Sequence, residues 1–327
     1  MAILLYGLLA RFFFIPPTIV IPPEQGASIF LSTDVDTSLR PSLEKAILDA
    51  KESVLLIIYS LSDPSIIHAL KKASQRGVHV TVVHDPVETS NAQAFLGKKV
   101  LCFPRRGRGL MHNKLLVIDH RFVWIGSANM STRSLTEQGN LVAGLESPSF
   151  AAAIEELSSA LIGQKPLRSP PAVLQNGLSR WTLYFHPYHG KESLQTLISK
   201  IEQASRRVFV AMFTFTHPDL VSSLCQAKKR GVDVRVIFDQ ESARQTSRKA
   251  FVRFKRSGVP CGYRTKAGLL HYKAALIDDL LVAGSCNWTK AGFFFNHEAM
   301  VFVDPIPSCH KEWIERWWRA VEQASGG

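Results

Sequence analysis

The sequence predicts an α/β protein made of two tandem domains of similar structure, and three observations support this prediction. Short apolar runs rich in β-branched residues alternate with amphipathic helical segments, as in layered α/β domains. Residues 42–85 resemble residues 193–239, so a large part of the chain is duplicated. A polar motif with a histidine and a lysine two residues apart also occurs once in each half.

Each copy of the duplicated stretch predicts the same elements in the same order: helix, buried strand, loop, helix, glycine corner and strand. In the first helix Leu43, Ile47 and Leu48 fall on one side, which indicates an amphipathic helix. The second helix of each copy is followed by a glycine, where helices commonly end. A proline, a glycine and an aspartate match between the copies: Pro64 and Pro218, Gly77 and Gly231, Asp85 and Asp239.

The two polar motifs share a histidine, a lysine, a short apolar run, an aspartate and a Gly-Ser-x-Asn corner. These residues are His112, Lys114, Asp119, Ser127 and Asn129 in the first half, and His271, Lys273, Asp278, Ser285 and Asn287 in the second. Each pattern predicts a strand, a tight turn and a second strand ending at the corner. Since alternate side chains on a strand share a face, each histidine is expected beside its lysine. Such groups are suited to gripping a phosphate and attacking it.

The chain is expected to contain an N-terminal segment, a first domain, a linker and a second domain: residues 1–26, 27–162, 163–180 and 181–327. The linker is predicted from its proline, serine and glycine content. A helix should close each domain, at 149–162 and at 310–323. Trp313 and Trp317 in the last helix are predicted to pack in the core.

The N-terminal segment is the most apolar part of the chain, although Arg11 and Pro16-Pro17 interrupt it. We expect a signal or a membrane anchor there, and therefore a membrane-associated or exported protein. The alternative is a cytoplasmic protein in which this segment packs on the first domain.

The composition favours a polyanionic partner, since 39 basic and 27 acidic residues give a net charge of +12. An anionic membrane surface and nucleic acid both fit. Arg106, Arg108 and Lys266, close to the two histidines in sequence, are candidates for steering a phosphate-bearing substrate. The five cysteines show no zinc or disulfide spacing, and no carboxylate cluster accompanies the motifs. No metal and no other cofactor is expected.

Two copies of H-x-K-x4-D, each with a following G-S-x-N, resemble the phospholipase D superfamily over nearly the whole chain. The resemblance implies two α/β sandwich domains related by pseudo-two-fold symmetry, with the active site between them. It also implies that one histidine attacks the phosphorus to form a covalent phosphohistidine. The other histidine would protonate the leaving alkoxide and then activate water or an alcohol.

Within this pattern Lys114 and Lys273 would neutralise the phosphate oxygens, aided by Asn129 and Asn287. Ser127 and Ser285 are expected to donate to the phosphate or to a histidine. Asp119 and Asp278 are expected to be structural residues that cap the turns. Asn140 is a further residue expected to support the site.

An acidic or amide residue downstream of each motif would orient a catalytic histidine, as the family resemblance implies. Counting from the motif asparagines gives Glu298 in the second half and Asn140 in the first. If the pairing crosses between halves, Glu298 serves His112 and Asn140 serves His271. This favours His112 as nucleophile and His271 as acid and base, although Glu137 is close enough in sequence to compete.

The predicted function is a phospholipase D-type phosphodiesterase that hydrolyses or transphosphatidylates membrane phospholipids at the membrane surface without a metal. The alternative is an endonuclease using the same chemistry, and a third reading is a non-enzymatic binding module. Phe293, Phe294 and Phe295 would enter a bilayer in the lipid reading, or pack beneath the second motif. One chain holds both motifs, so a monomer should suffice and no protein partner is required.

Overall fold

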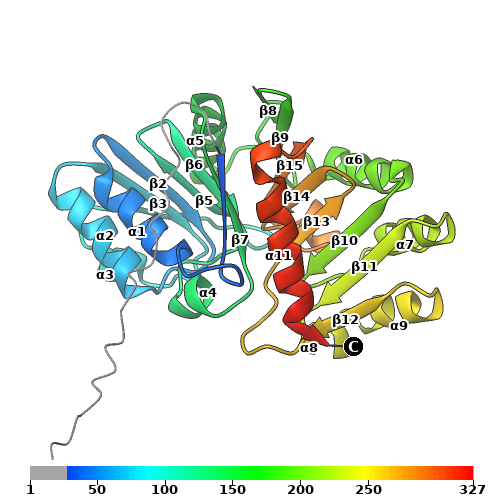
Figure 1. The fold of residues 1–327 in the computed structure, drawn as a ribbon. Helices are drawn as coiled ribbons and strands as arrows, with labels where there is room; N and C mark the ends of the chain where they lie inside the picture. The colour runs from blue at the N-terminus through cyan, green and yellow to red at the C-terminus, as the bar shows by residue number, and fades with distance from the viewer. Residues whose placement is uncertain (1–27, 327) are drawn as a thin grey trace, which may run out of the picture.

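A computed structural model of the chain describes residues 28–326, which form two halves that each contain one mixed sheet (Figure 1). The N-terminal segment predicted at 1–26 lies outside the described residues. The two halves repeat the same succession of strands and helices, as the internal duplication predicts. The prediction of an α/β fold with two tandem domains is confirmed.

The first half contains a seven-stranded sheet in the order β1-β7-β6-β5-β2-β3-β4, in which β2, β3 and β4 are parallel and the remaining pairs antiparallel. Its elements are β1 (Ser28–Ser32), α1 (Leu39–Asp49), β2 (Ser53–Ile58), α2 (Pro64–Gln75), β3 (His79–His84), α3 (Ala92–Leu96), β4 (Leu101–Pro104), β5 (Lys114–Ile118), β6 (Phe122–Gly126), α4 (Thr132–Thr136), β7 (Leu141–Glu146) and α5 (Pro148–Ile162).

The second half contains a nine-stranded sheet in the order β16-β12-β11-β10-β13-β14-β15-β9-β8. Its seven inner strands repeat the order of the first sheet, and β8 and β16 are added at the edges. The elements are β8 (Ala172–Asn176), β9 (Ser179–His186), α6 (Gly190–Gln203), β10 (Arg207–Met212), α7 (Pro218–Lys229), β11 (Asp233–Phe238), α8 (Gln240–Arg244), α9 (Arg248–Arg256), β12 (Cys261–Arg264), β13 (Lys273–Ile277), β14 (Leu280–Gly284), α10 (Lys290–Phe294), β15 (Glu298–Asp304), a 3₁₀ turn (Ser308–His310), α11 (Lys311–Gln323) and β16 (Ser325–Gly326).

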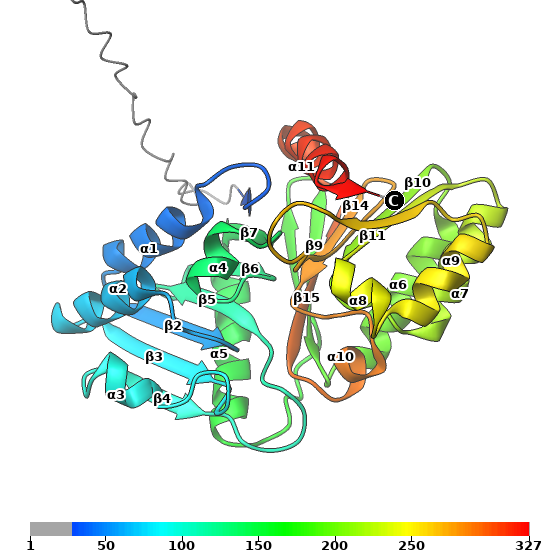
Figure 2. The ribbon, with the colours of Figure 1, turned by 90° about the horizontal axis from the view of Figure 1, so that it is seen from below.

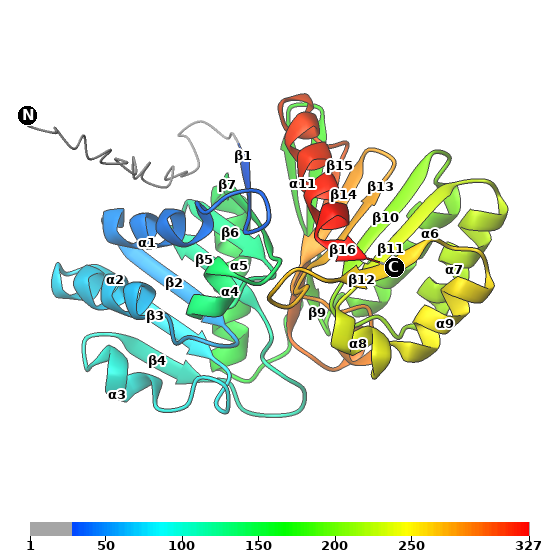
Figure 3. The same cartoon turned by 60° about the horizontal axis from the view of Figure 1, so that its bottom comes forward.

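The two sheets lie between two outer layers of helices (Figures 1 and 2). Helices α1 and α2 cover the outer face of the first sheet, and α6, α7 and α9 cover that of the second. Between the sheets lies one shared core, to which α5 and α11 also contribute. Figure 3 shows α11 running along the boundary between the halves. Trp317 of α11 is fully buried there, whereas Trp313 is partly buried at the edge of this core.

Strand β2 shows why these segments form buried strands. Leu55 and Ile57 point into the core between the sheets, whereas Val54, Leu56 and Ile58 point under α1 and α2. Because both faces are covered, every position of the strand except its first is apolar, as is usual for strands buried on two sides. The apolar runs therefore predict the positions of the inner strands well.

Helix α2 begins and ends at the residues that its sequence signals indicate. The Asp63 carboxylate accepts hydrogen bonds from the backbone N–H groups of Ser65 and Ile66, and Pro64 occupies the first turn. Gly77 follows the helix with φ +94°, and Gly231 follows α7 with φ +92°. A left-handed residue after a helix favours glycine, since other side chains are strained there.

The predicted linker at 163–180 is wrong in extent. It contains β8 and the start of β9, which pair as an antiparallel hairpin at the edge of the second sheet. Gly177 and Leu178 form the two-residue turn between the paired Asn176 and Ser179, with Gly177 at φ +58°. Glycine at the first position of a two-residue turn is typical of a hairpin, and this signal outweighs the proline and serine content around it. The connecting segment without regular structure is 163–171.

Candidate active site

Each motif histidine lies just before a central strand and is hydrogen-bonded to the other half of the chain. His112 precedes β5, and its backbone N–H donates to His297 O at 2.9 Å. His271 precedes β13, and its backbone N–H donates to Gly139 O at 2.9 Å. Each of the two residues is 7% exposed. Each motif is therefore held in place by the backbone just before a strand of the opposite half.

The side chains of the two histidines are also paired across the boundary. His112 Nδ1 lies 2.8 Å from Glu298 Oε2 and 3.0 Å from Oε1. His271 Nδ1 lies 3.1 Å from Asn140 Oδ1. This is the crossed arrangement expected from the sequence, and Glu137 is exposed and pairs with Arg133 instead.

The partners determine which ring nitrogen of each histidine carries the proton. Asn140 donates through Nδ2 to Ser134 O at 2.8 Å and to Gln138 O at 3.2 Å, so its Oδ1 faces His271. An amide oxygen and a carboxylate both accept hydrogen bonds. The Nδ1 of each imidazole therefore carries the proton, and Nε2 is left for chemistry.

The two lysines lie next to their histidines, as the two-residue spacing predicts. Lys114 Nζ donates to His112 O at 2.6 Å, and Lys273 Nζ donates to His271 O at 2.7 Å. Each ammonium group also lies 4.9 Å from the centre of an aromatic ring, Tyr59 in the first half and Phe213 in the second. Both lysines are buried, and no carboxylate forms an ion pair with either within residues 28–326.

The hydroxyl groups of Ser127 and Ser285 contact the partners of the histidines, which the sequence did not predict. Ser127 Oγ donates to Asn140 Oδ1 at 2.8 Å, and Ser285 Oγ donates to Glu298 Oε2 at 2.6 Å. Their oxygens accept the backbone N–H groups of Leu141 and Ala299. The serines therefore hold the orienting groups in position.

The two motif asparagines differ in their contacts. Asn129 is partly buried and its side-chain oxygen has no hydrogen-bond partner, whereas Asn287 Oδ1 accepts the backbone N–H of Thr214 at 3.2 Å. Asp119 and Asp278 lie away from the histidines. Each accepts three consecutive backbone N–H groups of the corner before β2 or β10: 51–53 for Asp119 and 205–207 for Asp278. This agrees with a structural role, although they hold a neighbouring corner and not their own turn.

The site concentrates positive charge in a buried space. Burial, together with Lys114 and Lys273, holds the pKa of both His112 and His271 well below the usual value. Burial also lowers the pKa of Lys114 to about 7, and raises the pKa of Glu298 to about 7. Because each lysine lowers the pKa of both histidines, the two motifs form a single site. In the absence of a phosphate the imidazoles are neutral, as a nucleophile requires.

Replacing Lys114 by methionine is expected to stabilise the protein by about 1–4 kcal/mol at neutral pH and to abolish turnover. The pKa of Lys114 is about 7 in the folded protein against 10.5 for an ordinary lysine. Between these values the unfolded state binds more protons, so wild-type stability rises with pH and the variant's advantage shrinks. Urea unfolding at about pH 6 and about pH 9 would measure both effects. A variant less stable than wild type at both pH values would contradict the prediction, and exposed Lys99→Met is the control.

Two aspartates that match in the repeat position the motifs, a role not assigned from the sequence. Asp85 Oδ2 accepts the backbone N–H of Met111 at 3.2 Å, and Asp239 Oδ2 accepts that of Leu270 at 3.1 Å. Each therefore holds the residue before a motif histidine. The sequence offered one signal for this role, because Asp85 and Asp239 occupy matching positions in the two copies of the duplicated stretch.

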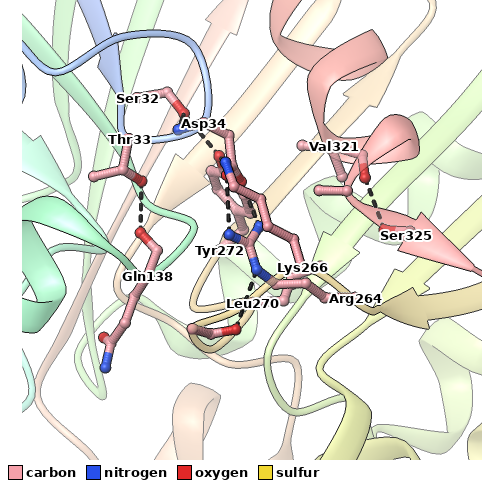
Figure 4. A network of polar contacts seen from close by, with 12 residues as sticks. Ser32, Thr33, Asp34, Gln138, Arg264, Lys266, Leu270, Tyr272, Val321 and Ser325 are labelled. Carbon is pink, nitrogen blue, oxygen red and sulfur yellow. Dashed lines mark hydrogen bonds and ion pairs between the residues drawn. The ribbon is translucent and has the colours of Figure 1, made fainter.

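A buried ion pair of Asp34 and Arg264 joins the two halves, in a network that also contains Tyr272, the residue after His271 (Figure 4). Arg264 Nη2 lies 2.9 Å from Asp34 Oδ1, and both side chains are 2% exposed. Lys266 Nζ and Tyr272 Oη also contact Asp34, at 3.1 and 3.0 Å. Lys266, predicted to steer substrate, is therefore part of this network. Arg106 and Arg108 are exposed.

The three consecutive phenylalanines near the second motif differ in their exposure. Of the three phenylalanines, Phe293 is fully buried, whereas Phe294 and Phe295 are 39% and 61% exposed.

Within residues 28–326 no three histidine, cysteine or carboxylate side chains come together as a metal site. None of the helices in these residues has the length and apolar character needed to span a bilayer.

Known proteins resemble this chain in both halves. A family described as "Cardiolipin synthase, PLD-like domain" matches residues 43–161 and 197–318. "Cardiolipin synthase A" of Pectobacterium atrosepticum is 25% identical over 325 residues, covering 86% of this chain and 66% of that protein. "Mitochondrial cardiolipin hydrolase" of Chlamydomonas reinhardtii is 30% identical over 133 residues, covering 39% of this chain and 59% of that protein. The chain thus spans about two thirds of the length of the cardiolipin synthase.

The fold also occurs in a solved structure. Phosphatidylserine synthase of Haemophilus influenzae superposes with a TM-score of 0.72 at 13% identity, covering 91% of this chain and 87% of that one. At this identity the likeness shows a shared fold. The two segments matched by the family cover most of the chain and contain both histidine motifs. The chain therefore belongs to the phospholipase D superfamily, within the family of cardiolipin synthase PLD-like domains.

Proposed function

We propose that this chain is a phospholipase D-type phosphodiesterase that acts on membrane phospholipids through a covalent phosphohistidine, by hydrolysis or by transfer to an alcohol. The observation that carries the proposal is the crossed pairing of His112 with Glu298 and of His271 with Asn140. Two buried imidazoles oriented through Nδ1 and two buried ammonium groups suit one phosphodiester. The cardiolipin synthase and cardiolipin hydrolase relatives support a lipid substrate.

In the proposed reaction the phosphate lies between the two histidines. Its negative charge offsets Lys114 and Lys273 and favours a proton on His271 Nε2. His112 Nε2 attacks the phosphorus, the bond to the leaving oxygen breaks, and His271 gives its proton to that oxygen. His271 then takes a proton from water or an alcohol, which attacks phosphorus and releases His112.

An endonuclease is the second candidate, favoured by the net charge of +12 and by the exposed Arg106 and Arg108 before the first motif. The same histidines would serve that reaction, because both substrates are phosphodiesters. What separates the candidates is the part of the substrate that lies outside the histidine pair.

The proposal is tested with purified protein and two substrate sets, in buffer containing EDTA. One set is vesicles of phosphatidylcholine, phosphatidylglycerol and cardiolipin; the other is single- and double-stranded DNA and RNA. Phosphatidic acid or a phosphatidyl-transfer product is expected, and His112→Ala should not form it. Cleavage of nucleic acid with unchanged vesicles would refute the lipid proposal. Activity that EDTA abolishes would refute the metal-independent mechanism.

A further inference from the structure

The ion pair of Asp34 and Arg264 has an equivalent position in the other half, and there the acid is missing. Arg105 stands as far before His112 as Arg264 stands before His271. Strand β9 is the counterpart of β1, and the pairing register matches Phe185 with Ser32, so Pro187 stands in the place of Asp34 with Tyr188 next to it. No carboxylate of the described residues forms an ion pair with Arg105.

The guanidinium of Arg105 is nevertheless partly buried and held in place. Its Nη1 donates to Arg108 O at 2.8 Å and to Gly109 O at 3.3 Å, and neither Nη2 nor Nε bonds to a carboxylate of the described residues. Asp85 acts on Arg105 electrostatically, but its oxygens accept backbone N–H groups of Val87, Glu88 and Met111. A partly buried cation without a paired anion favours binding of an external one.

A groove of about 480 Å³ opens beside this arginine, and we call it the Arg105 groove. Four cationic side chains line it and no carboxylate does: Arg105, Arg106, Arg108 and Lys165. The exposed Phe294 and Phe295 form part of its wall, as does Tyr188. Cationic side chains beside exposed aromatic rings are the lining expected for a phosphate attached to an apolar chain.

The groove is adjacent to the candidate active site. His297 borders it, and the backbone of His297 pairs with Leu110 and His112. The next residue, Glu298, holds the His112 imidazole. Burial and the nearby Arg105 lower the pKa of His297 to about 4, so His297 is neutral at pH 7 and the positive charge comes from the arginines and lysine.

We propose that the Arg105 groove is a second anion-binding subsite, which holds a phosphate of an anionic phospholipid other than the phosphate under attack. The equivalent arginine supports this, because Arg264 and Lys266 together hold the Asp34 carboxylate (Figure 4). In the first half a lipid phosphate supplies the anionic oxygens for Arg105, as the Asp34 carboxylate supplies them for Arg264 in the second half. The proposal rests on the lipid function proposed above, and it names the feature by which an anionic lipid is selected.

Binding tests the subsite without requiring turnover. His271→Ala protein, with and without Arg105→Gln, is sedimented with vesicles of phosphatidylcholine alone or with added phosphatidylglycerol or cardiolipin. Arg105→Gln is expected to weaken binding to both anionic vesicles about tenfold or more, as loss of a charged hydrogen bond would. The matched control Arg319→Gln, on the exposed face of α11, should bind as the parent does. Equal binding by the Arg105 variant would overturn the proposal.

Kinetics separates the subsite from the reacting phosphate. In otherwise wild-type protein, Arg105→Gln should raise KM for cardiolipin vesicles more than KM for soluble bis(p-nitrophenyl) phosphate, with a smaller effect on kcat. An equal rise for both substrates would place Arg105 at the reacting phosphate and refute a separate subsite. A loss confined to cleavage of single-stranded DNA would refute a lipid occupant. If wild-type protein turns over no lipid, the proposed function fails, while the sedimentation result still decides the subsite.

Discussion

Alanine at His112 or at His271 is expected to reduce turnover by at least about 10³-fold, with the covalent phosphoryl group found on His112. A side chain that attacks phosphorus and one that moves the proton are both required for each turnover. The two variants should nevertheless differ in what accumulates. His271→Ala retains the nucleophile, so it can form an adduct that it releases slowly, whereas His112→Ala should form none.

The assignment of His112 as nucleophile follows from the unequal partners of the two rings. Phosphorylation of Nε2 puts positive charge on the imidazole, and the carboxylate of Glu298 stabilises that charge better than the amide of Asn140 does. The adduct can be trapped by acid quenching with a phospholipid labelled in its phosphate, followed by peptide mapping. A label on His271 in the wild-type protein would reverse the two roles.

Replacing Arg264 by methionine is expected to lower the free energy of unfolding by about 3–5 kcal/mol. The change leaves the carboxylate of Asp34 buried with only Lys266, itself half-exposed, to balance it. The ion pairs with Arg264 and Lys266 keep the pKa of Asp34 below its usual value despite burial, so the carboxylate is charged at neutral pH. Urea unfolding would measure the loss.

A double variant and a surface control make this prediction specific. Asp34→Leu combined with Arg264→Met removes both charges, and should recover much of the stability lost by the single change. Arg206→Met breaks the exposed ion pair with Asp279, and should cost no more than about 1 kcal/mol. A single Arg264 variant as stable as the Arg206 variant would show that the buried pair does not hold the halves together.

The sequence predicts the parts of this molecule that depend on repetition and local pattern. The two α/β domains, the strands after Lys114 and Lys273 and the glycine ends of α2 and α7 are all visible in the printed chain. The crossed pairing of His112 with Glu298 was also predicted, because the spacing from each motif asparagine is the same in both halves. Whether these residues carry out catalysis is still a prediction.

Contacts between distant residues explain what the sequence did not predict. Asp34 and Arg264 are 230 positions apart, and both lie outside the duplicated stretch that the sequence analysis aligned. Gly139 is required beside this pair, since a Cβ there would lie 2.9 Å from Asp34 Oδ2 and 2.6 Å from the Tyr272 ring. The contact of Ser127 with Asn140 was not predicted for a similar reason, because it depends on how β6 and β7 pair.

The crossed hydrogen bonds also mean that the site is complete only when the two halves are assembled. Each half carries one histidine and the group that orients the histidine of the other half. If the chain were cut within 163–171 and the fragments produced separately, each fragment would contain one histidine without the group that orients it. Catalysis would then return only as the fragments recombine, in proportion to the complex formed. Fusing interacting proteins to the fragments would turn this dependence into a phosphodiesterase-based reporter of their association.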